Sequence, residues 1–137
     1  MLASPYSCPV CALPLESLPS SLRCAEGHSF DRHKKGYVNL LLAQNKNSKA
    51  PGDDALMVQS RRRFLEAGHY QTLAQRISAQ MTEKLPAQAT LWDAGCGEGY
   101  YTQMIAQANP DFDCYGLDIS KPAIVAASKY KNIHWSV

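Results

Sequence analysis

Residues 91–99 read LWDAGCGEG: a short strand pattern ends in an acid, Asp93, and runs into a loop with glycine at alternate positions. Glycine in such a loop lets the backbone adopt positive φ and approach a ligand closely at the carboxyl end of the strand. The spacing G-x-G-x-G differs from the dinucleotide fingerprint G-x-G-x-x-G. The loop therefore argues against a nicotinamide enzyme.

Carboxylates around this glycine loop indicate the charge of its ligand. Asp93 and Glu98 bracket the loop, whereas a pyrophosphate needs a neutral or positive site. Asp118 ends the next predicted strand, 19 residues after Gly99, where a carboxylate can accept hydrogen bonds from both ribose hydroxyls of a nucleoside. A nucleoside that carries positive charge meets both conditions, which predicts a site for S-adenosylmethionine. We expect it to be formed by Asp93, Gly95, Gly97, Glu98, Gly99 and Asp118.

The segment around the loop alternates short strand patterns with helix patterns. Strands are predicted at 90–94, 113–118 and 132–137, and helices at 100–108 and 122–130. This alternation is typical of a parallel sheet covered by helices.

Two further helices are predicted upstream of the sheet. Asp53 or Asp54 can cap a helix that runs to about residue 67, with Gly68 as its stop. Its predicted apolar stripe is Met57, Phe64 and Leu65, with Arg62 pointing away. The second helix, which Pro86 ends, has an apolar face of Tyr70, Leu73, Ala74, Ile77 and Met81.

The N-terminal region holds cysteines and a histidine with metal-site spacing. Cys8, Cys11, Cys24 and His28 follow the pattern C-x2-C-x12-C-x3-H, in which each close pair can meet one ion from a tight turn. Three sulfurs and one nitrogen favour zinc in a structural site. His33 is the rival fourth ligand, but it lies in a charged stretch. A set of buried free thiols is the alternative to a metal site.

The rest of this region is predicted to be rich in β-structure. Strands are expected at 21–23, 29–31 and 36–42. Residues 43–52, AQNKNSKAPG, are polar and are expected to form a linker or mobile loop.

Composition narrows the class of protein further. The 137 residues are 45% hydrophobic and 19% charged, which indicates a folded globular chain. The sequence has neither a secretory signal nor an apolar run near the roughly 20 residues that span a bilayer. We therefore expect a cytoplasmic protein without a membrane partner, whose five cysteines are thiols or metal ligands.

Positive charge is concentrated in residues 32–63, where eight Lys/Arg stand against two Asp/Glu, a balance of +6. Such an excess suits contact with a polyanion, although a solvated face explains it equally well.

These elements together resemble a known family. CPVC, CAEGHSFD, GYVNLL, PGD, RRRFLEAGHY, DAGCGEGYYT and GLDISK occur in this order, as in the RlmA-type 23S rRNA (guanine-N1)-methyltransferases of bacteria. The resemblance implies a zinc finger at 1–42, a basic linker with helices at 43–89, and the N-terminal part of an S-adenosylmethionine-binding methyltransferase domain at 90–137. The implied fold class is α/β, with a truncated Rossmann-like class I methyltransferase sheet behind a small β-rich zinc finger and a helical linker.

The resemblance also implies roles for particular residues. Cys8, Cys11, Cys24 and His28 bind zinc, and Gly95, Gly97, Glu98 and Asp118 belong to the cofactor site. Tyr70 is expected to close over that site, whereas the residues alone favour an ordinary core aromatic. The implied partner is 23S rRNA, and a homodimer is left open.

Guanine N1 lies on the Watson–Crick edge, so the enzyme must take an unpaired base or flip one out of the stack. The phosphate contacts expected in the finger and linker are Arg32, Lys34, Lys35, Lys46 and Lys49. Phe30 or Tyr37 could stack on a base or could fill the core near the zinc. The general base that accepts the N1 proton is unassigned, and His69 is as readily structural.

Two other functions stay open at the sequence level: a small-molecule methyltransferase with a structural finger, and a non-catalytic RNA-binding module. The basic segment disfavours the first, and the acids Asp93, Glu98 and Asp118 disfavour the second. Because residues 90–137 supply only the first strands of a methyltransferase sheet, we expect the 137-residue chain alone to be an inactive fragment with an uncovered first strand.

Overall fold

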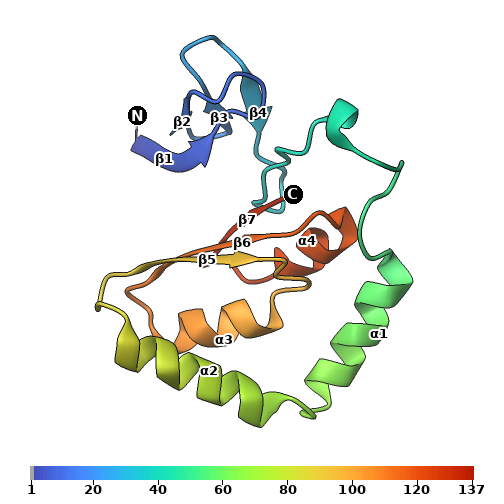
Figure 1. Cartoon of the computed structure of the whole chain (residues 1–137), viewed down its shortest axis with the longest axis vertical. Coiled ribbons are helices and arrows are strands. Elements are labelled where there is room, and N and C mark those ends of the chain that lie inside the picture. The colour runs from blue at the N-terminus through green and yellow to red at the C-terminus, as the bar shows by residue number, and fades with distance from the viewer. Residues whose placement is uncertain (1) are drawn as a thin grey trace.

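The chain builds two sheets, one from each end of the sequence, in a computed structural model that describes residues 2–137 (Figure 1). The N-terminal sheet is antiparallel in the order β1-β2-β3-β4, and the second is parallel in the order β5-β6-β7. The elements are β1 Leu2–Ser7, β2 Pro14–Ser17, β3 Ser21–Arg23, β4 Ser29–Asp31, α1 Ala55–Glu66, α2 Gln71–Lys84, β5 Thr90–Ala94, α3 Tyr100–Ala108, β6 Asp113–Leu117, α4 Lys121–Ala127 and β7 His134–Ser136, with a 3-10 turn at Ala43–Asn45.

The parallel sheet and its helices form in the predicted order, although α4 ends at Ala127 instead of near residue 130 and β7 spans His134–Ser136 instead of 132–137. Helices α2 and α3 pack on each other below the sheet, whereas the N-terminal sheet lies above it (Figure 1). The core between sheet and helices contains Ile105, Phe112, Cys114, Ile124 and Trp135, all buried. The expected α/β class, a parallel sheet behind a small β-rich unit, is confirmed.

Residues 36–42 were expected to form a strand of the finger, and this prediction is wrong. Val38 makes an isolated antiparallel bridge to Arg32 and an isolated parallel bridge to Ser136 of β7. The Val38 N–H donates to the Trp135 carbonyl at 3.1 Å, and the Leu40 N–H donates to the Val137 carbonyl at 2.9 Å. The segment therefore lies along the outer edge of β7, while β5 is the other outer strand among the described residues.

The two sheets are also joined by side chains. The Tyr37 ring is 3% exposed and belongs to the core of the parallel sheet. From the other side, the Tyr6 ring packs edge-on against Trp92 and Tyr115, with centroids 5.4 and 5.8 Å away. The N-terminal sheet is thus fixed to the parallel sheet through both its first strand and the segment that follows its last.

The end of the linker is held in place by contacts, although its polar composition suggests a mobile loop. The Ser120 hydroxyl donates to the Asp53 carbonyl, and a Cβ on Gly52 would lie 2.9 Å from the Ser120 nitrogen. The end of the linker is therefore packed against the start of α4.

The helix α1 begins where predicted but buries a different stripe. Asp54 caps it, because its carboxylate accepts from the Met57 N–H at 2.9 Å. Val58 and Leu65 are buried, whereas Met57 and Phe64 are about half exposed, at 51% and 47%. The predicted stripe of Met57, Phe64 and Leu65 is wrong in two of its three members. Within residues 2–137, every helix is too short or too polar to cross a lipid bilayer.

Candidate functional site

The three cysteines of the N-terminal unit and one of its histidines meet at one point. The ligand atoms of Cys8, Cys11, Cys24 and His28 all lie within 4.8 Å of one another. The Cys24 Sγ is 3.3 Å from the His28 Nδ1, and the Cys11 Sγ is 3.7 Å from the Cys24 Sγ. Cys8 and Cys24 are buried, so the cluster is largely closed to water.

Two tight turns produce this convergence. In the first, the Ala12 N–H donates to the Cys8 carbonyl at 2.8 Å. In the second, the Gly27 N–H donates to the Cys24 carbonyl at 3.0 Å. Each turn presents both of its ligands on the same side, as expected for a two-knuckle metal site.

The donor set fits zinc in both chemistry and size. A tetrahedral ion with Zn–S bonds of about 2.3 Å places its sulfurs about 3.8 Å apart, close to the separations found here. His33, the rival ligand, lies outside the cluster, and its ring stacks on Tyr37 at 4.7 Å. Cys114 is buried in β6, and Cys96 is buried in the loop after β5; both belong to the core of the parallel sheet and lie outside the cluster.

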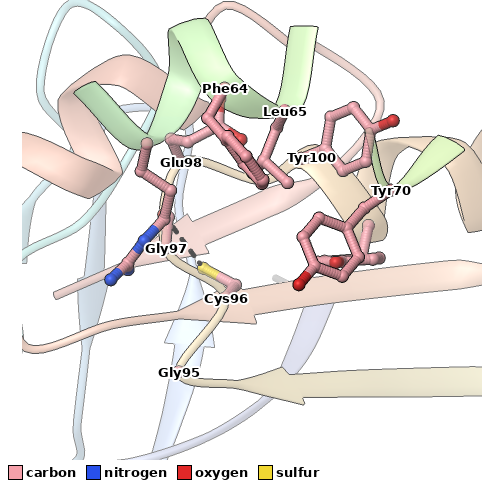
Figure 2. Close-up of a pocket in the computed structure, with 10 residues that line it drawn as sticks. Phe64, Leu65, Tyr70, Gly95, Cys96, Gly97, Glu98 and Tyr100 are labelled. Carbon is pink, nitrogen blue, oxygen red and sulfur yellow. Dashed lines mark hydrogen bonds between the residues drawn. The ribbon is translucent and has the colours of Figure 1, made fainter. Parts of the chain in front are cut away.

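A cavity of about 340 Å³ lies over the glycine loop, between the loop and the α1–α2 corner (Figure 2). Four of the predicted cofactor residues line it: Tyr70, Gly95, Gly97 and Glu98. Phe64 and Leu65 reach it from α1, and Tyr70 faces the loop from the start of α2 (Figure 2). A cavity of this size suits a small ligand.

Glu98 places a buried carboxylate in the wall of this cavity. The residue is 3% exposed, and its Oε1 has no hydrogen-bond partner among the described residues. Burial raises the pKa of Glu98, while the positive charges of Lys129 and Arg62 act in the opposite direction. An unpartnered buried acceptor is costly, so a ligand that donates a hydrogen bond or carries positive charge would be stabilised here.

The remaining predicted residues brace the loop. The Asp118 Oδ2 accepts from the Gly97 N–H at 2.9 Å, and its Oδ1 accepts from the Ser120 N–H at 2.8 Å. The Asp93 Oδ2 accepts from the Thr102 hydroxyl at 2.6 Å. Gly99 has φ +84°, and a Cβ on it would lie 2.7 Å from the Trp135 ring, so only glycine suits this position.

The same acids act on the cysteine of the loop. Burial, with the charges of Asp93 and Asp118, raises the pKa of the Cys96 thiol. Cys96 is therefore a neutral thiol at physiological pH and a poor nucleophile.

The predicted RNA contacts lie along the joint between the two sheets. Arg32 donates to the Ser17 hydroxyl at 2.7 Å and lines a hollow with Lys34, whereas Lys46 and Lys49 line a second hollow. Lys35 lines neither. Of the two aromatics considered for base stacking, Tyr37 is buried in the sheet core and Phe30 packs against the core around the cysteine cluster.

Sequence reasoning from the loop alone missed the α1 contribution to the cavity. Arg61, Phe64 and Leu65 line it, as do Tyr100 and Tyr101 of α3. Arg61, Phe64 and Leu65 lie in the run RRRFLEAGHY, which sequence reasoning used only as part of the family resemblance. Both Phe64 and Leu65 line the cavity, but Phe64 is half exposed and Leu65 is buried, a difference that an apolar stripe predicted from spacing alone does not show.

Comparisons with known proteins agree with this geometry. Residues 6–49 match the family described as RlmA, N-terminal, a zinc ribbon. Over 124 residues the chain is 36% identical to a 23S rRNA (guanine(748)-N(1))-methyltransferase of Streptomyces fradiae. The aligned region covers 89% of this chain and 43% of that relative. These matches confirm the resemblance to the RlmA-type family. The chain spans less than half the length of that relative.

Among solved structures, the chain is similar to the plantazolicin methyltransferase BpumL. The TM-score is 0.43 at 22% identity, over 57% of this chain and 32% of that one.

Proposed function

Because the chain resembles the RlmA-type 23S rRNA (guanine-N1)-methyltransferases from its zinc ribbon through its glycine loop, we propose that the protein methylates N1 of a guanine in a hairpin loop of 23S rRNA. S-adenosylmethionine and zinc are its cofactors under this proposal. One observation carries it: a cluster of three cysteines and a histidine able to hold a metal, and a glycine loop with a buried acid unpartnered among the described residues, occur in one chain, whose two halves are joined by hydrogen bonds of the Val38 segment to the end of the parallel sheet.

Zinc is held by Cys8, Cys11, Cys24 and His28 in this proposal. The finger comprises residues 1–42, a basic linker with helices spans 43–89, and the cofactor-binding unit is 90–137. Among residues 2–137, the buried aliphatic side chains in the core around the cluster are Leu15, Leu22 and Val38. The metal therefore contributes much of the folding free energy of the finger.

The glycine loop and its acids position the cofactor. S-adenosylmethionine, when bound, supplies a methyl group on a positively charged sulfonium. Glu98 gives the cavity a buried acceptor next to which positive charge is stabilised. The Asp118 carboxylate fixes the loop through Gly97 and keeps lone pairs free to accept from ribose hydroxyls. Tyr70 closes the cavity from the α2 side.

The reaction takes place on an unpaired or flipped guanine, because N1 is hidden in a base pair. The protein's contribution is positioning and electrostatics. We assign no general base among residues 2–137. His69 stacks on Phe64 with ring centroids 4.7 Å apart, which suits a structural role.

The partner under this proposal is 23S rRNA, and the compartment is the cytoplasm, where ribosomes are assembled. Arg32, Lys34, Lys35, Lys46 and Lys49 are proposed phosphate contacts. The interactions would be salt-dependent, since each phosphate contact releases counterions.

A labelled-methyl assay separates this function from its rivals. A strain that expresses the protein from its own gene is compared with one that lacks it, and label from S-adenosylmethionine is followed into ribosomal RNA and into metabolites. Label in 23S rRNA supports the proposal. Label only in small molecules indicates a small-molecule methyltransferase, and cofactor-independent RNA binding without transfer indicates a non-catalytic module.

A further inference from the structure

We propose that a basic groove runs from the finger to the carboxyl edge of the parallel sheet and holds the phosphodiester backbone of a single RNA strand. The methyltransferase side of this groove is Lys121, at the start of α4. This inference rests on the proposed function and names the surface by which the RNA reaches the cofactor site.

The groove consists of two hollows that share walls. The first, of about 450 Å³, is lined by Arg32, His33 and Lys34 of the finger. The second, of about 280 Å³, is lined by Lys46 and Lys49 of the linker. Asn39 and Lys121 line both, so the hollows meet at these two residues. A track across three segments of the chain suits an extended ligand better than a single small anion.

The lysines of the groove form no ion pair with neighbouring acids, and Asp31, which lines the first hollow, pairs with none of its cations among the described residues. Among the ion pairs within residues 2–137, none involves Lys34, Lys46, Lys49 or Lys121. Asp53 lines the second hollow but pairs with Arg61 at 2.7 Å. Asp54 also lines it, but one of its oxygens accepts from the Met57 N–H at the start of α1. The lysines are therefore available for phosphate oxygens.

Local packing fixes Lys121 next to the linker lysines. The Ser120 hydroxyl donates to the Asp53 carbonyl and accepts from the Ala123 N–H, so the first turn of α4 is tied to the end of the linker. Gly52 approaches Ser120 so closely that a Cβ could not be added. The second hollow is thus built by contacts between residues distant in the sequence.

The groove leads toward the cofactor site. Ile119, half exposed, lines the second hollow and follows Asp118, whose carboxylate holds the glycine loop. An RNA strand that leaves the second hollow therefore arrives at the carboxyl end of β6, beside the loop. Finger and cofactor site would then act on one continuous strand.

The test is the salt dependence of binding to a fluorescein-labelled, mixed-sequence single-stranded oligoribonucleotide, measured by anisotropy on the zinc-loaded full chain. Lys121→Gln is expected to flatten the slope of log affinity against log salt by about 0.7, the value for one phosphate contact on a single strand. Lys34→Gln and Lys49→Gln are expected to act similarly. Lys121→Arg should restore the slope, and Lys84→Gln, on the far helix α2, is the matched control.

Equal slopes for Lys121→Gln and Lys84→Gln would overturn the groove. Loss of binding to anionic phospholipid vesicles in Lys121→Gln, with RNA binding intact, would overturn it as well. Since the probe contains no particular target, these failures count against the groove alone. The labelled-methyl assay decides the proposed function separately.

Discussion

The Asp118 carboxylate accepts a hydrogen bond from the Gly97 N–H at 2.9 Å, across 21 residues of sequence. Its second oxygen accepts from the Ser120 N–H. The acid that the sequence assigns to a ribose therefore also sets the position of the glycine loop. Loss of this carboxylate should affect both the loop and the ligand.

Asp118→Ala is expected to weaken S-adenosylmethionine binding by about 1.5–3 kcal/mol, the range for hydrogen bonds to a charged group. Calorimetric titration measures it. Asp118→Asn, which keeps one carbonyl acceptor, should fall between wild type and Asp118→Ala. Unchanged affinity in Asp118→Ala would show that the ribose lies elsewhere.

Much of the parallel sheet could be predicted from the sequence, because its signals are local. The strand at 90–94 and the helix at 100–108 have the predicted bounds, since a glycine loop separates two clear periodicities. The convergence of the four metal-ligating side chains was also predictable, because it depends on the spacing of cysteine and histidine in the sequence. The four atoms converge as the spacing requires.

The predictions that were wrong or missing concern elements whose position depends on contacts between segments distant in the sequence. The strands β1 and β2 have prolines and no clear alternation, so they were missed. Residues 36–42 look like a finger strand, yet Val38 bonds to β7 about 100 residues later. The sequence does not show that Lys121 lies next to the basic linker, because this proximity depends on the hydrogen bond from the Ser120 hydroxyl to the Asp53 carbonyl.

Gly116→Ala tests the packing beneath the loop. A Cβ at Gly116 would overlap the Trp135 ring on the adjacent strand and lie 3.2 Å from the Cys96 Sγ. We expect a loss of about 1–3 kcal/mol in the free energy of unfolding, typical of overpacking. Denaturant melts measure it. Trp135→Phe should partly rescue Gly116→Ala, and additive losses in the double variant would contradict a direct clash.

Metal removal tests the joint between the sheets. We expect about one zinc per chain, with Cys24→Ser removing most of it. Because Tyr37 fills the sheet core and Val38 bonds to β7, chelation should also lower the melting temperature of the parallel sheet. Metal analysis and thermal melts followed by circular dichroism measure both effects.

Cys114→Ser is the matched control, since it changes a buried cysteine outside the cluster. Its zinc content should equal that of the wild type. A wild-type chain purified without chelator that holds no zinc would contradict the metal assignment.

Glu98 should make stability depend on pH. Burial raises its pKa in the folded state, so the folded chain keeps its proton at a pH where the unfolded chain has lost it. Stability from this group is fully present below the ordinary pKa of 4.5 and falls as the pH rises through the raised folded-state pKa.

Glu98→Gln removes the ionisable group and therefore the loss of folding stability that ionisation of Glu98 causes as the pH rises. At neutral pH the variant should melt at a higher temperature than the wild type, and the difference should vanish below about pH 4. Exposed Glu83→Gln is the control and should show no such trend. A lower melting temperature for Glu98→Gln at neutral pH would mean that the charged form is stabilised in the fold.

The most direct test of the cofactor site is a titration of the zinc-loaded, isotope-labelled chain with S-adenosylmethionine, followed by backbone amide NMR. We predict saturable shifts centred on the loop residues Gly95, Gly97, Glu98 and Gly99, extending to Tyr70 and Asp118. Titration with NAD should leave these amides unmoved. Absence of shifts in the loop of a folded chain, or shifts confined to the finger, would contradict the account.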